Sequence, residues 1–487
     1  MIAQLLALAV AAAAPASPGG GPSALPALDG ADAALLVARM DRMGRMVSFL
    51  ERAGRHSVIL RPTSWVSEVH PLLSFDPTRP DSIASVGIDP TAGITISLFP
   101  DQRVTCVAVS DPARYEQQAQ ARLGQLGAVG RAKDGAASVV VAAVKSRAVA
   151  GYVMRGKLSC ATEGPRTEDL LRRAARALAR PPRRGPWASA ASAEDTAYFV
   201  APRFNLQVTG KLDVLEARGT NSLGGTTGVV PALRPGGPSP YGGVAPSGLL
   251  LLRARVAPDG VRRLLGRMGA ELLSACEVCN PDIVGGLMGS MREQLTGEVM
   301  LRVDRVKAPP GSLRTRTARY SAVKHAYLAE VSRPEVASAA LESLIKLGAV
   351  RTAQDTYAIK AGTESGAGNV FAGLSGTHLY FANDEEALKA ALSMVAQAKP
   401  APLEHSMDIF ADPRLVSRAL GQVSLLDLMS SRDLAPLVAA GTELGPLLAN
   451  TDQLSGWYDS DGAQQRFAFT WKLAPSPAPA SDAGTAR

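Results

Sequence analysis

The stretches LGQLGAV at residues 123–129 and LIKLGAV at residues 344–350 are two versions of one segment, and they decide the fold. An apolar strand pattern lies upstream of each, at residues 103–109 and 326–331, and a helical pattern connects that strand to the quoted segment. A short match carries little information alone. Because the surrounding elements run in parallel, the pair indicates an internal duplication.

The two helices begin and end with the same signals. SDP at residues 110–112 and SRP at residues 332–334 place a serine or its neighbour at the cap and proline in the first helical position. Gly127 and Gly348 follow the helices, where we expect left-handed caps.

The order of elements also repeats downstream. Each copy has strand patterns, then a second amphipathic helix, then a short apolar segment before proline. The leading segment LLVARMDRMGRM at 35–46 resembles residues 262–273 and predicts a helix in each copy. The other matching segments are 137–144 and 357–362, 149–160 and 370–381, 170–178 and 388–395, and 198–202 and 407–413.

This order predicts an α+β chain of two similar lobes, each a mainly antiparallel sheet with helices on one face, ferredoxin-like in its order of elements. A C-terminal hairpin is expected at 456–472, turning at Asp461 and Gly462. The predicted organisation is a signal peptide at 1–16, a disordered linker at 17–29, a first lobe at 30–216, a Gly/Pro-rich connection at 217–248, a second lobe at 249–473 and a disordered tail at 474–487.

The layout over residues 90–473 resembles exported bacterial proteins of unknown function that are built from duplicated α+β units. The resemblance implies an exported, two-lobed protein. It implies no activity and assigns no site residues.

Composition excludes several classes of protein. The 487 residues are 46% hydrophobic and 20% charged, which excludes fibrous and wholly disordered chains. The net charge of +8 is too small and diffuse to predict a nucleic-acid-binding protein. No motif for a cofactor is recognisable.

The first sixteen residues, MIAQLLALAVAAAAPA, have the pattern of a secretory signal peptide. Their apolar run is shorter than the roughly 20 residues that span a bilayer, and Ala14 and Ala16 suit signal cleavage. The absence of Lys or Arg before this run leaves an uncleaved, Ala-rich tail as the alternative. We predict a mature chain that starts near Ser17, lies in the periplasm or cell envelope and has no transmembrane segment.

Four cysteines in an exported chain favour disulfides. Aligning the copies sets Cys106 opposite Leu328 and Cys160 opposite Phe381, so both cysteines replace core residues on strands. Those strands are neighbours in a ferredoxin-like order, which predicts a Cys106–Cys160 bridge, with two buried thiols as the alternative.

Cys276 and Cys279 form the segment CEVC. A redox-active CxxC lies at a helix N-terminus, where the helix dipole lowers the thiol pKa, but this one follows a helical pattern. We therefore expect a local structural disulfide rather than a redox centre. Zinc would require two further ligands at usable spacing.

An arginine-rich amphipathic helix offers a docking surface. Its polar face suits an acidic partner or anionic lipid, and an ordinary solvated face is the alternative. No aromatic residues interleave with the arginines, which argues against nucleic acid. The candidate docking residues are Arg166, Arg172, Arg173, Arg176 and Arg180.

Other patterns are weaker. The S-x-x-K pairs Ser321/Lys324 and Ser343/Lys346 lack the partner motifs of penicillin-binding enzymes. The glycine-rich segment 362–376 lies between two strands, so we expect a hairpin loop rather than a phosphate cradle.

Two histidines and a group of methionines have less specific patterns. His325 and His378 fall on strands of one copy and could approach each other, in structural roles. Met40, Met43 and Met46 with Val47 and Leu50 have helical spacing, which indicates core packing, or else an adaptable groove.

These patterns support three hypotheses. The first is a non-catalytic exported binding or scaffold module whose partner is an envelope protein or anionic lipid. The alternatives are a periplasmic carrier of an apolar ligand and an unrecognised hydrolase. No catalytic, metal or cofactor residues are assigned.

Overall fold

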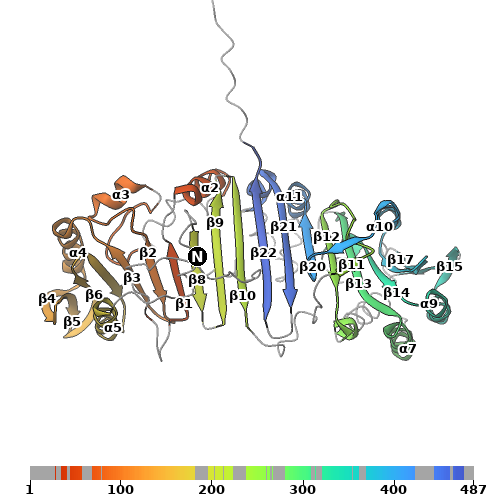
Figure 1. The fold of residues 1–487 in the computed structure, drawn as a ribbon, viewed down its shortest axis with the longest axis horizontal. Coiled ribbons are helices and arrows are strands. Elements are labelled where there is room, and N and C mark those ends of the chain that lie inside the picture. Colours follow the sequence, from red (N-terminus) through yellow and green to blue (C-terminus); the bar gives the residue numbers. More distant parts are fainter. Residues whose placement is uncertain are drawn as a thin grey trace, which may run out of the picture. The chain divides into compact units, whose positions relative to one another are not determined.

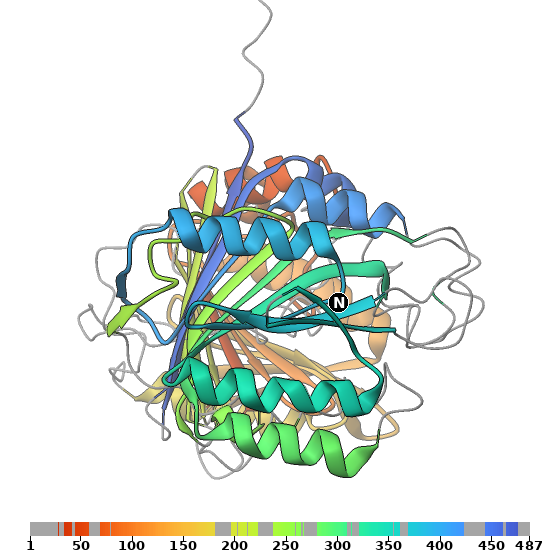
Figure 2. The ribbon, with the colours of Figure 1, turned by 90° about the vertical axis from the view of Figure 1, so that its right-hand side faces the viewer.

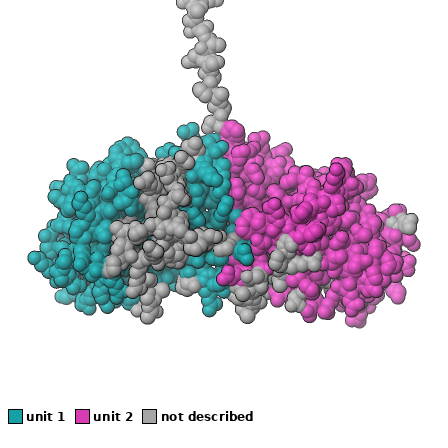
Figure 3. All heavy atoms as spheres, viewed as in Figure 1, with its two compact units in different colours: residues 1–222, 466–468 teal, residues 223–465, 469–487 magenta. Residues whose placement is uncertain are grey.

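A computed structural model gives the fold of the chain, and it divides into two compact units. Unit 1 comprises residues 1–222 and 466–468, and unit 2 comprises residues 223–465 and 469–487 (Figure 3). The structure describes residues 28, 34–40, 44–57, 69–77, 79–180, 196–201, 203–211, 213–222, 237–258, 260–263, 266, 280–308, 313, 321–353, 355–360, 369–422, 444–460 and 464–475.

Unit 1 is built on one antiparallel sheet (Figure 1). Its strands pair in the order β10–β9–β8–β1–β2–β3–β7–β6–β5–β4. The elements are β1 (Leu36–Met40), α2 (Gly44–Gly54), α3 (Pro80–Ser85), β2 (Ile94–Leu98), β3 (Arg103–Ala108), α4 (Pro112–Leu126), β4 (Ala128–Asp134), β5 (Ala137–Val144), β6 (Arg147–Arg155), β7 (Leu158–Glu163), α5 (Thr167–Ala179), β8 (Thr196–Ala201), β9 (Phe204–Lys211) and β10 (Val214–Asn221).

Unit 2 also contains an antiparallel sheet, with the pairing order β21–β20–β12–β13–β14–β18–β17–β16–β15 and a separate β11–β19 pair. Its elements are β11 (Gly237–Ser239), β12 (Leu250–Arg255), α7 (Pro281–Arg292), β13 (Leu295–Val306), β14 (Val323–Val331), α9 (Pro334–Leu341), the 3-10 helix η3 (Glu342–Leu347), β15 (Val350–Ala353), β16 (Thr356–Lys360), β17 (Asn369–Ser375), β18 (His378–Ala382), α10 (Glu385–Gln397), β19 (Ala401–Leu403), β20 (Met407–Ala411), α11 (Pro413–Gly421) and β21 (Thr451–Ser460). Strand β22 (Gln465–Leu473) is divided, because its residues 466–468 belong to unit 1 and the rest to unit 2.

The two units share an order of elements. In unit 1, β3 is followed by α4, the meander β4 to β7, and α5; in unit 2, β14 is followed by α9 and η3, the meander β15 to β18, and α10. The antiparallel neighbours also correspond, since β3 pairs with β7 as β14 pairs with β18. A common origin of the units by duplication remains a prediction.

The hairpin turns refine the alignment of the copies. Gly156 and Gly376 turn the matching hairpins with φ of 60° and 59°, the left-handed region that glycine adopts without strain. Counting from these turns places Tyr380, and not Phe381, at the position of Cys160. Tyr380 is also the strand partner of Leu328, as Cys160 is of Cys106.

The helix caps agree only in part with expectation. Asp111 caps α4 by accepting a hydrogen bond from the Arg114 N–H, whereas Arg333 caps α9 with its backbone alone. Gly348 adopts the predicted left-handed conformation, with φ of 80°. Gly127 is extended instead, and a Cβ there would lie 2.5 Å from the carbonyl oxygen of Ala143. This glycine therefore permits close backbone approach rather than a cap.

The prediction that helices cover one face of each sheet is wrong. In unit 1, α4 packs on one face and α5 on the other, so neighbouring β7 residues point into different cores: Cys160 toward α5 and Ala161 toward α4. In unit 2, α10 covers one face and α7, α9 and η3 cover the other (Figure 2). A strand such as β7, with four consecutive buried residues, requires cover on both faces.

Three other segments differ from expectation. The predicted helix at 35–46 is divided between β1 and α2, so Met40 lies on a central strand and does not share a helix with Met46. The predicted connection at 217–248 includes the end of β10 and all of β11. The 456–472 hairpin corresponds to β21 and β22, and its turn at Asp461 and Gly462 lies outside the described residues, as do residues 1–27 with the predicted signal peptide.

Two glycines of unit 1 provide a test of the two-faced packing. A Cβ on Gly151 in β6 would lie 2.6 Å from the Val140 carbonyl oxygen and 2.8 Å from Cδ1 of Leu171 in α5, whereas one on Gly130 in β4 meets nothing within 4 Å. Gly151→Ala should lower the free energy of unfolding by roughly 1 to 3 kcal/mol because the backbone and α5 must shift. Gly130→Ala should change it by less than about 0.5 kcal/mol. Urea denaturation followed by circular dichroism measures both, and equal effects would contradict the close contact of α5 with the sheet.

Candidate functional site

The predicted cysteine pair is present in unit 1. Cys106 on β3 and Cys160 on β7 are direct strand partners, and their sulfurs lie 2.21 Å apart. Both side chains are buried in the core beneath α5. The pair joins residues separated by 54 positions. Cys276 and Cys279 lie outside the described residues, so their pairing remains a prediction.

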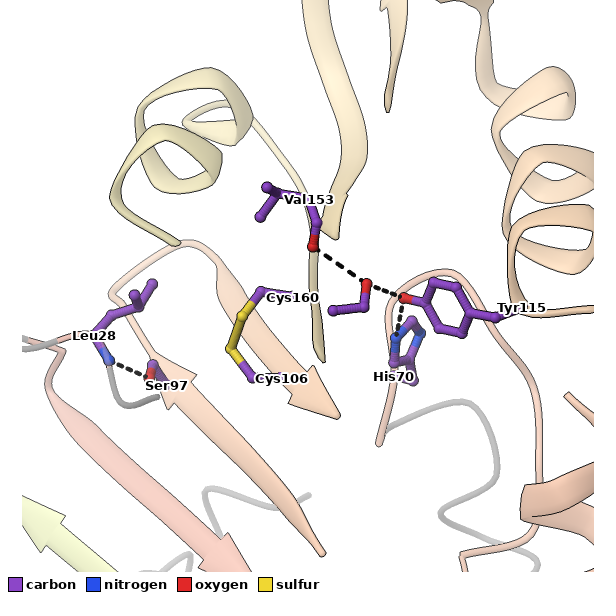
Figure 4. Close-up of a disulfide and its surroundings, with 8 residues drawn as sticks. Leu28, His70, Ser97, Cys106, Tyr115, Val153 and Cys160 are labelled. Atoms are coloured by element: carbon purple, nitrogen blue, oxygen red, sulfur yellow. Dashed lines mark hydrogen bonds between the residues drawn. A yellow bond between two sulfur atoms is a disulfide. The ribbon is translucent and has the colours of Figure 1, made fainter. Parts of the chain in front are cut away.

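A buried polar network occupies the opposite face of the same two strands (Figure 4). The backbone N–H groups of Leu72 and Leu73 donate to Nδ1 of His70 at 3.2 and 3.1 Å. That arrangement assigns the imidazole proton to Nε2, which lies 3.4 Å from the Tyr115 hydroxyl. Ser159 on β7 continues the chain, with its hydroxyl 2.9 Å from that of Tyr115 and 3.3 Å from the Val153 carbonyl oxygen.

Burial determines the protonation of this network. His70 is buried, and burial, reinforced by the positive charge of Arg103, lowers its pKa to about 3. Burial also raises the pKa of Tyr115 above its ordinary value. Both groups are therefore neutral at pH 7 and bond to each other and to the backbone, which suits a structural role. Sequence reasoning overlooked His70 because no motif surrounds it.

Unit 2 has a row of charged residues across its sheet instead. Arg255 on β12 donates to Glu298 on β13 at 2.7 Å, and both side chains are largely buried. Arg253 on β12 bonds Asp408 on β20 at 3.2 Å and lies over the Phe410 ring. Burial lowers the pKa of Arg253 and raises that of Asp408, while each partner's charge opposes the change. These ion pairs connect neighbouring strands.

The row continues beyond β20. Asp459 on β21 accepts from the Ser406 N–H at 2.8 Å and lies 3.1 Å from Nδ1 of His405. The His405 ring stacks on Trp457 at 4.0 Å between centroids. An imidazole oriented by a carboxylate occurs in catalytic dyads, but Ser406 Oγ is buried and is not presented as a nucleophile. We assign the pair to positioning the segment before β20.

His325 and His378 do not meet. His378 pairs across from Glu330 at one end of the β14–β18 pair, and His325 bonds Asn383 at the other end. His378 Nδ1 lies 3.2 Å from the hydroxyl of buried Tyr241, and burial lowers the pKa of both histidines. The two histidines therefore do not form a common site, and their structural role remains a prediction.

The contacts of the S-x-x-K pairs do not indicate catalysis. Ser343 Oγ donates to the Ala340 carbonyl oxygen at 2.7 Å within its own helical segment. Burial lowers the pKa of Lys324, with no nucleophile bonded to it among the described contacts. The glycine-rich segment lies largely outside the described residues at 361–368. No group of three or more His, Cys, Asp or Glu residues in the described ranges could hold a metal ion.

The arginines of α5 are partly neutralised by their own helix. Arg172 pairs with Glu168, and Arg173 and Arg166 both pair with Asp169, at 3.0 and 3.3 Å. Arg176 bonds the Arg172 carbonyl oxygen. Arg180, the last candidate, is the exposed C-cap. The positive charge of three of the five candidate arginines is therefore locally offset by Glu168 and Asp169, and the docking role of the helix remains a prediction.

The outermost strand of each meander is exposed. All seven residues of β4 and all four of β15 are solvent-exposed, and each strand pairs with only one neighbour in the described part of the chain. Val129 and Val350, which end the two segments quoted at the outset, are 45% and 65% exposed. Open strand edges carry unpaired backbone groups that can bind another strand. These edges are the candidate interaction sites.

Comparison of the chain with protein-family models, with curated proteins and with solved structures finds no match in any of the three. Among the described residues, no helix is long and apolar enough to cross a membrane.

The cysteine pair gives one prediction. Replacing Cys106 and Cys160 together by alanine should lower the free energy of unfolding by about 2 to 4 kcal/mol through loss of the crosslink, in addition to the cost of the smaller side chains. Denaturation with and without reductant measures the difference, since only the wild type should respond to reductant at this site. Non-reducing peptide mapping is the control, and recovery of Cys106 joined to Cys276 or Cys279 would contradict the assignment.

His70 gives a pH dependence. Its folded-state pKa of about 3 lies below the unfolded value of about 6.5, so between these values only the unfolded chain takes up the proton. The contribution of His70 to the free energy of unfolding is therefore fully present above pH 6.5 and falls as the pH decreases. Between pH 7 and pH 5 the loss from this group is roughly 2 kcal/mol. In His70→Asn, whose amide oxygen can accept the same N–H bonds, this part of the pH dependence should disappear. Urea denaturation at several pH values measures the free energy of unfolding of both proteins, and an equal dependence on pH would contradict the assignment to His70.

Proposed function

We propose that the chain is a non-catalytic binding or scaffold module exported to the cell envelope, where it engages another polypeptide. The main support for this proposal is that β4 and β15 are exposed strands at the outer edges of their meanders, each with one described neighbour. Open strand edges offer backbone hydrogen-bonding groups to another polypeptide.

The interior chemistry supports binding over catalysis. The buried charges described above are matched across strands, as in Arg255–Glu298 and Arg253–Asp408. His70 is neutral, buried and fully engaged with neighbours. These side chains are buried and paired within the protein, whereas a catalytic group must reach substrate.

The crosslink supports export. Disulfides persist in oxidising compartments, and the pairing of Cys106 with Cys160 is compatible with such a compartment. The signal-like residues 1–16 are a second, independent argument, taken from sequence alone.

The proposal is tested with affinity-tagged mature protein crosslinked in envelope extract. Mass spectrometry should identify one polypeptide recovered at a constant ratio, and that polypeptide should retrieve the chain reciprocally. A single enriched lipid species without a polypeptide would favour the apolar-ligand carrier, and turnover of an envelope substrate would favour the hydrolase. N-terminal sequencing should give a start near Ser17, and an intact Met1 in the cytoplasmic fraction would contradict export.

A further inference from the structure

The β4 edge is ordered by its hairpin with β5. Asp134 and Ala137 close a two-residue turn that contains Gly135, with φ of 59°. In an antiparallel hairpin with such a turn the closing pair is hydrogen-bonded, and alternate pairs follow the same pattern. The residues whose backbone N–H and C=O groups hydrogen-bond to β5 are therefore Ala128, Gly130, Ala132 and Asp134. The backbone N–H and C=O groups of Val129, Arg131 and Lys133 point to the open edge.

One face of this edge combines apolar and basic side chains. Val129 lies opposite Ala142 on β5, so Val144, two residues further along, is on the same face, and each valine is 45% exposed. Arg131 and Lys133 share that face by strand alternation. Glu116 pairs with Arg131, while Lys133 and the turn residue Lys145 have no acidic partner in the described part of the chain.

We infer that the β4 edge binds an acidic, extended polypeptide segment by adding it as a further strand, an inference that rests on the proposed function. The outward backbone groups supply the hydrogen bonds. Val129 at one end of the strand accepts an apolar side chain, and Lys133 toward the other end favours a glutamate or aspartate on the same face of the added strand. A second copy of β4 fits poorly, because a symmetric antiparallel pairing centred on Arg131 would oppose two arginines. Basic side chains on open edges act against such self-pairing.

The β15 edge is a poorer receptor. It has four residues, and its register with β16 shifts between Arg351 and Ala353. Irregular, short edges resist strand addition. The inference is therefore confined to β4.

The test uses the full mature chain and a fluorescein-labelled eight-residue peptide whose alternate residues, which share one face of an extended strand, are valine toward one end and glutamate toward the other, with threonine between them. Fluorescence anisotropy should show saturable binding that weakens with salt, and the same peptide with lysine in place of glutamate should bind at least tenfold more weakly. Arg131→Pro removes one outward N–H without removing a bond to β5, so it should weaken binding at least tenfold. Arg131→Ala, which keeps that N–H, should remain within about threefold of the wild type.

Amide exchange provides a readout that does not depend on the proline variant folding. Adding the glutamate peptide to the wild type should slow exchange at Val129, Arg131 and Lys133 and leave the β5-bonded amides unchanged. Peptide binding without this pattern, or equal binding by Arg131→Pro and Arg131→Ala, would overturn the inference. If the peptide fails to bind while a polypeptide is still recovered from the envelope, the β4 inference is wrong and the proposed function stands. If neither is observed, both are wrong.

Discussion

The pairing of β3 with β7 supports the rest of unit 1, because these two strands are tied together on both of their faces. The Cys106–Cys160 pair joins them beneath α5, and the chain from His70 through Tyr115 to Ser159 anchors β7 beneath α4. On one side lies a covalent bond and on the other a set of neutral, buried hydrogen bonds. The strand pair is thus the place where both cores of the unit meet.

Burial on both faces constrains which residues these strands can carry. A strand covered on one side alternates apolar and polar residues, whereas β3 and β7 each bury four consecutive residues. Polar side chains are tolerated there only with partners, and Thr105 meets the requirement by donating to the Val69 carbonyl oxygen at 2.9 Å. In unit 2 the matched ion pairs Arg255–Glu298 and Arg253–Asp408 meet the same requirement with charge.

Much of the element order could be read from the sequence, because proline, glycine and apolar periodicity are local signals. The turn glycines and the prolines that open α4 and α9 are such signals, whereas the Cys106–Cys160 contact was predicted from the alignment of the two copies. The side of the sheet that each helix covers is a tertiary property, although the apolar run CVAV at residues 106–109 is consistent with burial on both faces. The 35–46 segment was misjudged because Met40, Met43 and Met46 fit helical spacing, while central placement between β2 and β8 made residues 36–40 a strand. The role of His70 could not be predicted from local sequence, because its network consists of backbone groups and of residues 45 and 89 positions away.

The correspondence between the units means that each chain carries both versions of the same strand pair. Unit 1 has a sulfur crosslink at the position where unit 2 has Leu328 and Tyr380. A chain held in a reducing environment therefore loses support in one unit and keeps it in the other. Proteases that act on locally opened protein would then find their first cleavage sites in unit 1, so that reduction leaves a C-terminal fragment as its signature.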